Sequence, residues 1–169
     1  MSTLFAKYDV PAPRYTSYPT VPYWESAPDA LTWVQHLKLS LKEQDSSWAM
    51  YLHVPYCETL CTFCGCNNII TKDHNREEPY VNLILKEWQI YIEQVPEFKQ
   101  RPLKNLHIGG GTPTFLSASA LKKMLKPILD SVQLAPNFEG SIEVDPRRTT
   151  NEQLVVLKEL GFDRVSLGV

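Results

Sequence analysis

The sequence has no excess of charge of either sign and no long apolar run. Its 169 residues carry 17 Lys and Arg against 19 Asp and Glu, a formal net charge of -2 at pH 7. Without surplus positive charge, a nucleic-acid backbone or an anionic lipid surface gains no electrostatic attraction, so we expect neither partner. No stretch is long enough to cross a bilayer, and the first residues lack the pattern of a secretory signal, so we expect a cytoplasmic protein.

Cysteine is scarce and confined to one short stretch. All four cysteines fall between Cys57 and Cys66, too close together to join distant loops by disulfides. Their spacing, C-x3-C-x2-C-x-C, favours metal binding in a reducing compartment. A structural zinc site usually draws two separated pairs of ligands, whereas one loop with three thiolates fits an iron–sulfur cubane that keeps one iron open. We favour the cluster, with a zinc site or a group of free thiols as the alternatives.

Proline and aromatic residues dominate residues 1–28. Because proline fixes φ and removes a backbone donor, we predict an extended arm here rather than a helix. The arm's rings need a surface to pack on, and we favour the body of the protein over a large flat ligand. These rings are Tyr8, Tyr15, Tyr18, Tyr23 and Trp24.

Apolar residues then recur at helical spacing. A helix is predicted at residues 29–44, with Asp29 as its N-cap. Its predicted buried face consists of Leu31, Val34, Leu37 and Leu41. We therefore predict a first region, residues 1–45, made of the arm and this helix.

Strands and helices are predicted to alternate after residue 45. The predicted strands are residues 49–54, 105–108, 141–144 and 164–167, and the predicted helices are residues 79–94, 119–132 and 151–160. Strands separated by helices of this length form a parallel sheet with right-handed crossovers. A closed barrel of eight such units takes roughly 250 residues. We therefore predict an α/β fold in which residues 46–169 are the first part of a TIM-like barrel that stops after the fourth strand, in a piece of a longer chain.

Two further motifs follow predicted strands. Gly109, Gly110 and Gly111 precede Thr112, and glycines let a backbone approach a ligand closely, although such a run is often only a tight turn. Glu143 lies on the strand face opposite Ile142 and points either to a ligand hydroxyl or to the surface. Because ligands of such barrels sit at the carboxyl ends of strands, these motifs and the cysteine loop are predicted to share one site.

The cysteine spacing after the first strand resembles the radical S-adenosylmethionine (radical SAM) superfamily. Further motifs resemble the oxygen-independent coproporphyrinogen III oxidase family within it: P-R-Y-T-S-Y-P-T from Pro13, Y-L-H-V-P-Y-C from Tyr51, C-G-C from Cys64, G-G-G-T-P-T from Gly109 and I-E-V-D-P-R from Ile142. The resemblance covers essentially the whole chain. It implies oxidative decarboxylation of two propionates of coproporphyrinogen III to vinyl groups, with a 4Fe–4S cluster, S-adenosylmethionine and an electron-donor protein.

The resemblance also implies residue roles. Cys57, Cys61 and Cys64 would hold the cluster. Gly110, Gly111, Thr112 and Glu143 would bind S-adenosylmethionine, Glu143 through the ribose. Tyr51 would lie beside the cofactor and His53 near the cluster, as groups of the catalytic site. Three roles remain open for Cys66: a spare thiol, a fourth ligand in damaged protein, or a catalytic group near the cluster; His53 has the alternative of a core histidine bonded to backbone.

A related radical SAM haem chaperone is the second family considered. It resembles this chain around the first three cysteines, but it typically lacks the arm motif that begins at Pro13 and a cysteine at the position of Cys66. Both features are present here, so we favour the oxidase family.

Overall fold

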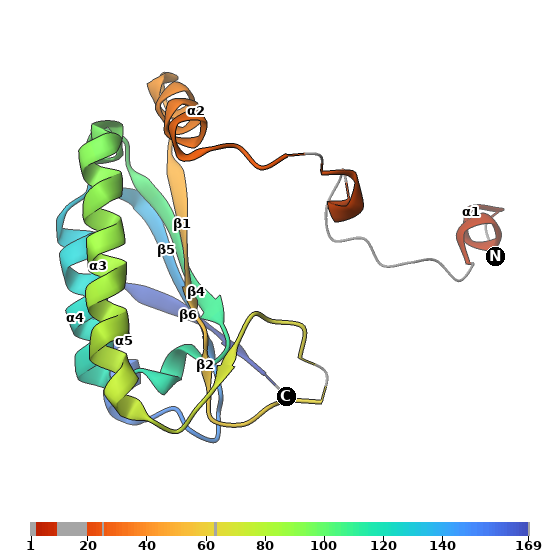
Figure 1. The fold of residues 1–169 in the computed structure, drawn as a ribbon, viewed down its shortest axis with the longest axis vertical. Helices are drawn as coiled ribbons and strands as arrows, with labels where there is room; N and C mark the ends of the chain where they lie inside the picture. Colours follow the sequence, from red (N-terminus) through yellow and green to blue (C-terminus); the bar gives the residue numbers. More distant parts are fainter. Residues whose placement is uncertain (1–2, 10–19, 25, 63, 169) are drawn as a thin grey trace. The chain divides into compact units, whose positions relative to one another are not determined.

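A computed structural model of the chain describes residues 3–9, 20–24, 26–62 and 64–168. Contacts divide the chain into two compact units, Met1–Trp33 and Val34–Val169. Figure 1 shows the helices and strands, coloured along the sequence. The division predicted at residue 45 stays a prediction.

The first unit begins with a helix, α1 (Thr3–Tyr8), so the prediction that no part of residues 1–28 is helical was wrong. The reason is local, since the first proline is Pro11 and nothing before it restricts the backbone. A short 3-10 helix, η1 (Val21–Tyr23), follows. Of the motif from Pro13 to Thr20, the residues up to Pro19, with Tyr15 and Tyr18, lie outside the described residues. Tyr8, Tyr23 and Trp24 are exposed.

The predicted helix after the arm is α2 (Ala30–Lys42). Asp29 caps it as predicted, because the Thr32 amide donates to Asp29 Oδ1 over 2.7 Å. Leu41 is buried as predicted. Leu31 is exposed, so its assignment to the buried face was wrong. Val34, about one turn after Leu31, packs against the core.

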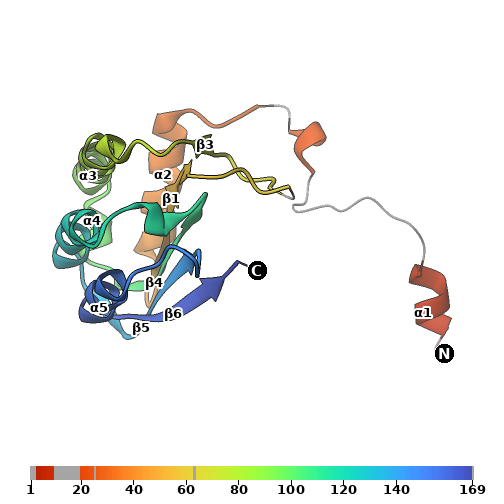
Figure 2. The ribbon, with the colours of Figure 1, turned by 90° about the horizontal axis from the view of Figure 1, so that it is seen from below.

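The second unit contains the parallel sheet that the alternating pattern predicts. Its strands are β1 (Trp48–Val54), β4 (Leu103–Gly110), β5 (Leu134–Val144) and β6 (Phe162–Leu167), paired in the order β1-β4-β5-β6. The crossovers contain α3 (Glu77–Gln94), α4 (Ala118–Asp130) and α5 (Asn151–Glu159), which lie together on one face of the sheet (Figure 2). A short parallel pair, β2 (Tyr56–Cys57) and β3 (Ile69–Ile70), joins the two ends of the cysteine loop.

The two faces of the sheet differ because side chains alternate along each strand. One face packs on the helices through a buried apolar set: Leu52, Val54, Leu106, Ile108, Ile142 and Val144. The residues between them point to the other face, so the parallel register aligns Tyr51 with His107 and His107 with Ser141. The opposite face is therefore polar and aromatic, and it carries the candidate site.

β5 begins at Leu134, seven residues before the strand predicted there. Pro136 and Gly140 interrupt the expected strand pattern, yet the strand continues through both. A Cβ on Gly140 would lie 2.9 Å from the Phe162 Cα, so the missing side chain lets β6 approach. The pairing shifts register at this point, between Gly140 and Ser141.

α5 is tied to the glycine-rich turn by one buried side chain. Gln153 Nε2 donates to the carbonyls of Thr114 and Leu116 over 2.9 and 2.7 Å. We expect Gln153→Leu to lower the free energy of unfolding by about 1–3 kcal/mol, because both buried carbonyls lose their donor. Denaturant titration measures this, with the exposed Val155→Ala as control, expected to stay within about 0.5 kcal/mol. Equal losses in the two variants would contradict the prediction.

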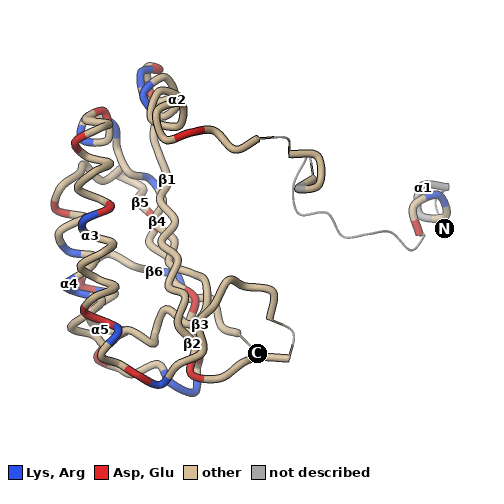
Figure 3. Tube along the Cα trace, in the orientation of Figure 1, with Lys and Arg blue, Asp and Glu red and all other residues tan. Residues whose placement is uncertain are grey.

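Basic and acidic residues are interspersed along α3, α4 and α5 rather than separated by sign (Figure 3). Within the described ranges, no helix combines the length and the apolar character needed to span a membrane.

Candidate functional site

Backbone hydrogen bonds bring the glycine-rich turn against the cysteine loop. The Gly111 amide donates to the Val54 carbonyl and the Thr112 amide donates to the Tyr56 carbonyl, each over 2.8 Å. At the other end of the cysteine loop, the Thr71 amide donates to the Cys57 carbonyl over 2.8 Å. The two motifs that the sequence predicted to share a site therefore lie side by side at the carboxyl ends of β1 and β4.

The four cysteines differ in burial. Cys57 is buried, whereas Cys61, Cys64 and Cys66 are exposed and form no disulfide. Cys57 Sγ accepts a hydrogen bond from Thr112 Oγ1 over 3.4 Å, and Cys64 Sγ accepts one from Asn68 Nδ2 over 2.9 Å. Burial, followed by the neighbouring Cys64, raises the pKa of the Cys66 thiol.

The arrangement of these thiols bears on the kind of metal group that they fit. Among the residues described, no three His, Cys, Asp or Glu side chains surround a single point where one metal ion would sit. A structural zinc ion takes four such donors around it, and a catalytic zinc ion takes three and a water. A 4Fe–4S cluster makes a different demand, because each thiolate binds its own iron. Three soft thiolates on one short loop match the donor set of such a cluster.

Gly110 and Gly111 have no room for side chains. Gly110 has φ +115°, and a Cβ there would lie 2.8 Å from both the Val54 carbonyl oxygen and the His53 ring. A Cβ on Gly111 would lie 2.8 Å from Cys57 Sγ. The turn is therefore built on close approach to the cysteine loop, which a larger residue would prevent.

Tyr51 and His53 form a hydrogen-bonded pair that reaches the cysteine loop. His53 Nε2 lies 2.7 Å from the Asn67 carbonyl oxygen, which can only accept, so this nitrogen carries a proton. In the neutral ring, Nδ1 then accepts from Tyr51 Oη over 3.2 Å. Partial burial, followed by the charge of Glu143, raises the pKa of Tyr51, so the phenol remains protonated and can donate. His53 thus bonds to backbone, as its alternative role proposed, but on the polar face of the sheet rather than in the core.

Glu143 lies two residues beyond Ser141 on β5 and faces the end of β4. Its Oε2 accepts from the Gly110 amide over 3.2 Å, and its Oε1 lies 3.5 Å from His107 Nε2. His107 Nδ1 in turn lies 2.7 Å from Ser141 Oγ, and the His107 ring stacks on Tyr51 at 5.7 Å. His107 and Ser141 were not predicted from the sequence, although period-two alternation and the pairing of β4 with both neighbours place them here.

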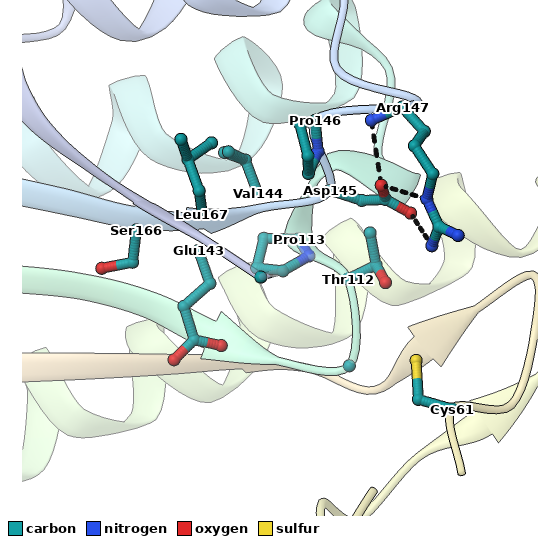
Figure 4. Close-up of a pocket in the computed structure, with 12 residues that line it drawn as sticks. Cys61, Thr112, Pro113, Glu143, Val144, Asp145, Pro146, Arg147, Ser166 and Leu167 are labelled. Atoms are coloured by element: carbon teal, nitrogen blue, oxygen red, sulfur yellow. Dashed lines mark hydrogen bonds and ion pairs between the residues drawn. The ribbon is translucent and has the colours of Figure 1, made fainter. Parts of the chain in front are cut away.

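An open pocket of about 720 Å³ borders these groups (Figure 4). Its lining includes Cys61, Gly111, Thr112, Glu143, Asp145, Arg147, Ser166 and Leu167. Asp145 accepts two hydrogen bonds from the Arg147 guanidinium, each of 2.9 Å, and these bonds hold the pKa of Asp145 below its usual range. The pocket therefore has a cysteine at one side, the glycine turn and Glu143 beside it, and a paired charge at its rim.

A network of charged side chains stabilises the start of the cysteine loop. It was not predicted from the sequence. Glu58, next to Cys57, pairs with Arg148 after β5 and lies 3.4 Å from His74 Nε2. His74 Nδ1 donates to Glu77 Oε1 over 2.6 Å, and the ring stacks on Phe115. Each partner comes from a different element, so only the assembled fold reveals the network.

This network predicts a pH dependence of stability. The hydrogen bond to Glu77 raises the pKa of His74, although partial burial opposes it, so the ring's stabilisation is complete below about pH 6.5 and is lost as the pH rises through the higher folded pKa. Burial raises the pKa of Glu77, but the hydrogen bonds from Ser117 and His74 outweigh it and lower that pKa, so the carboxylate's contribution is lost only as the pH falls below about 4.3. We expect the free energy of unfolding to decline by less than about 1 kcal/mol between pH 6 and pH 8, since the His74 side chain is half exposed and solvent screens the pair.

Denaturant titration of the chain and of His74→Gln at both pH values measures this contribution. The variant retains the other three histidines, so the difference between the two slopes isolates His74. Identical slopes would show that the ring contributes nothing.

Comparison with known proteins relates this geometry to a family. Residues 51–169 match the model of the radical SAM superfamily. The chain belongs to the radical SAM superfamily. This family implies a 4Fe–4S cluster and S-adenosylmethionine, and residues 51–169 contain all four cysteines, the glycine turn and Glu143.

Individual relatives of this radical SAM chain carry a more specific name. It is 36% identical to the oxygen-independent coproporphyrinogen III oxidase of Pseudomonas aeruginosa over 98% of its own length and 36% of the relative's. The enzyme of the same name from Escherichia coli is 34% identical, with 98% of this chain and 35% of the relative covered. The solved structure of coproporphyrinogen III oxidase from Escherichia coli, a radical SAM enzyme, matches 99% of this chain and 36% of that one, with a TM-score of 0.78 and 32% identity. The chain therefore spans about one third of the length of these relatives.

Proposed function

We propose that this chain is the cluster-binding and cofactor-binding part of an oxygen-independent coproporphyrinogen III oxidase. The observation that carries the proposal is one cluster of features: a three-cysteine loop, a glycine turn packed on its first thiol, and Glu143 bonded to that turn. The similarity to the coproporphyrinogen oxidases over nearly the whole chain supports the choice of substrate. The proposed reaction, in the cytoplasm, converts two propionates of coproporphyrinogen III to vinyl groups. Each propionate loses carbon dioxide, a hydrogen atom that passes to the radical derived from the cofactor, and an electron that passes to an acceptor.

In this proposal, Cys57, Cys61 and Cys64 hold the cluster. When bound, the cluster and S-adenosylmethionine supply one-electron chemistry that generates a radical able to remove a hydrogen atom from carbon. The electron comes from a donor protein. The protein's own contribution is binding and orientation, since the difficult chemistry belongs to the cofactor.

The positions of the side chains support the remaining proposed roles. Glu143 has two oxygens, each with one protein partner, so lone pairs remain to accept hydroxyl hydrogens of a ribose. Gly110, Gly111 and Thr112 offer a backbone that a ligand can approach closely. Tyr51, His53 and Cys66 are proposed to face the reacting groups; His53 holds the Tyr51 hydroxyl in place from the side of the cysteine loop.

Anaerobic reconstitution of the chain with iron and sulfide, followed by electron paramagnetic resonance of the reduced protein, tests the proposal. Adding S-adenosylmethionine should shift the cluster signal, because the cofactor binds the iron that has no protein ligand. A signal that the cofactor leaves unmoved would overturn the proposed site. We expect little or no decarboxylation by these 169 residues alone, since they span about one third of the related enzymes; turnover equal to that of a full-length enzyme would contradict this.

A further inference from the structure

One side chain on the polar face of the sheet has no role in the proposed function, yet it contacts three residues there. His107 lies at the centre of β4, in register with Tyr51 on β1 and with Ser141 on β5. Its ring contacts Tyr51 by stacking and bonds to Ser141 and Glu143 through its two nitrogens.

The partners of the ring define its tautomer. The Glu143 carboxylate can only accept, so His107 Nε2 must carry the proton that faces it. In a neutral ring Nδ1 is then an acceptor, and the Ser141 hydroxyl donates to it over 2.7 Å. The direction of donation therefore runs from Ser141 through His107 to Glu143.

Glu143 depends on two donors for its orientation. The Gly110 amide fixes Oε2 over 3.2 Å, but a carboxylate held at one oxygen can still turn about that bond. The donor on His107 faces the other oxygen, Oε1. With both oxygens engaged, the plane of the carboxylate is defined, and the unused lone pairs point in fixed directions.

We propose that His107 is a positioning residue for the S-adenosylmethionine site: it orients the Glu143 carboxylate through Nε2 and is itself oriented by Ser141. The inference rests on the proposed function, in which Glu143 binds the ribose. A ligand that meets a carboxylate already aimed loses less freedom on binding than one that must first order it.

Two substitutions at the same position separate positioning from packing. His107→Gln places an amide donor near the site of Nε2 and can still reach Glu143, whereas His107→Asn places its amide near Nδ1, facing Ser141, and cannot. Both lose the ring that stacks on Tyr51. Ser141→Ala keeps the ring but removes the donor that orients it, and it serves if a variant at position 107 does not fold.

The first measurement needs neither cluster nor cofactor. Hydrogen exchange of the Gly110 amide in the chain as it stands reports whether Glu143 is held against it. We expect exchange about tenfold faster in His107→Asn, a change of a few fold in Ser141→Ala, and a rate near that of the unchanged chain in His107→Gln. Equal rates in the Asn and Gln variants would overturn the inference, because a purely structural role loses the ring in both.

The second measurement is equilibrium binding of S-adenosylmethionine to the reconstituted chain. We expect Kd to rise about tenfold in His107→Asn and less in His107→Gln. If the unchanged chain binds no S-adenosylmethionine, the proposed function fails, while the exchange of Gly110 still decides whether His107 orients Glu143. If the unchanged chain binds and His107→Asn binds equally well, the proposed function stands and the positioning role fails.

Discussion

Cys61→Ser and Cys64→Ser should each leave the chain without its cluster after anaerobic reconstitution, whereas Cys66→Ser should not. The unchanged chain is expected to take up about four irons, and the two variants close to none. A serine oxygen is a poor replacement for a soft thiolate toward iron, and the proposed cluster has only three protein ligands to begin with. Iron and sulfide analysis, with the visible absorbance of the protein, measures the difference.

Cys66 provides a matched control for this comparison. Cys61, Cys64 and Cys66 are all exposed, so none of the substitutions removes a buried side chain. A general effect on folding would appear in all three variants, whereas loss of a ligand appears in two. Retention of the cluster in Cys61→Ser, or its complete loss in Cys66→Ser, would require a different set of ligands.

The sheet could be predicted because its signals are local. Apolar runs at β1 and β4 and helical spacing along α3 and α4 are each readable within one segment, and parallel pairing follows from the alternation of strand and helix. α1 was missed for an equally local reason: a prediction made for the whole proline-rich arm was applied to residues that precede its first proline. The extension of β5 was missed because the effect of Gly140 depends on Phe162, which is distant in sequence.

In the candidate site too, residues within one segment could be predicted, and contacts between distant segments could not. Cys57, Cys61 and Cys64 could be predicted as ligands because their spacing lies within one loop, and that assignment stays a prediction for the reconstitution experiment. The contacts of His107 with Tyr51 and Ser141 depend on the register between three strands, and a shift of one residue would turn the ring to the helices. The pairing of Glu58 with Arg148 joins residues 90 apart in the sequence. The spacing of residues within one segment cannot predict contacts between partners so distant in sequence.

Gly110→Ala should lower the free energy of unfolding by about 2–4 kcal/mol, combining strain at a positive φ with a steric clash. Gly110 has φ +115°, a conformation that residues with a side chain rarely adopt. The new methyl group would lie 2.8 Å from the Val54 carbonyl oxygen, which cannot move freely because it accepts from the Gly111 amide. The same methyl group would clash with the His53 ring, which forms hydrogen bonds with the Tyr51 hydroxyl and the Asn67 carbonyl.

Gly65→Ala is the matched control for that substitution. Gly65 lies within the cysteine loop, but its φ is not in the positive region and a Cβ there meets nothing within 4 Å. Its replacement should change stability by less than about 1 kcal/mol, with any gain coming from a less flexible unfolded chain. Denaturant titration of the metal-free chain compares the two directly. A small effect in Gly110→Ala would mean that the turn can rearrange, and the close packing of the glycine turn on the cysteine loop would then not be a requirement of the fold.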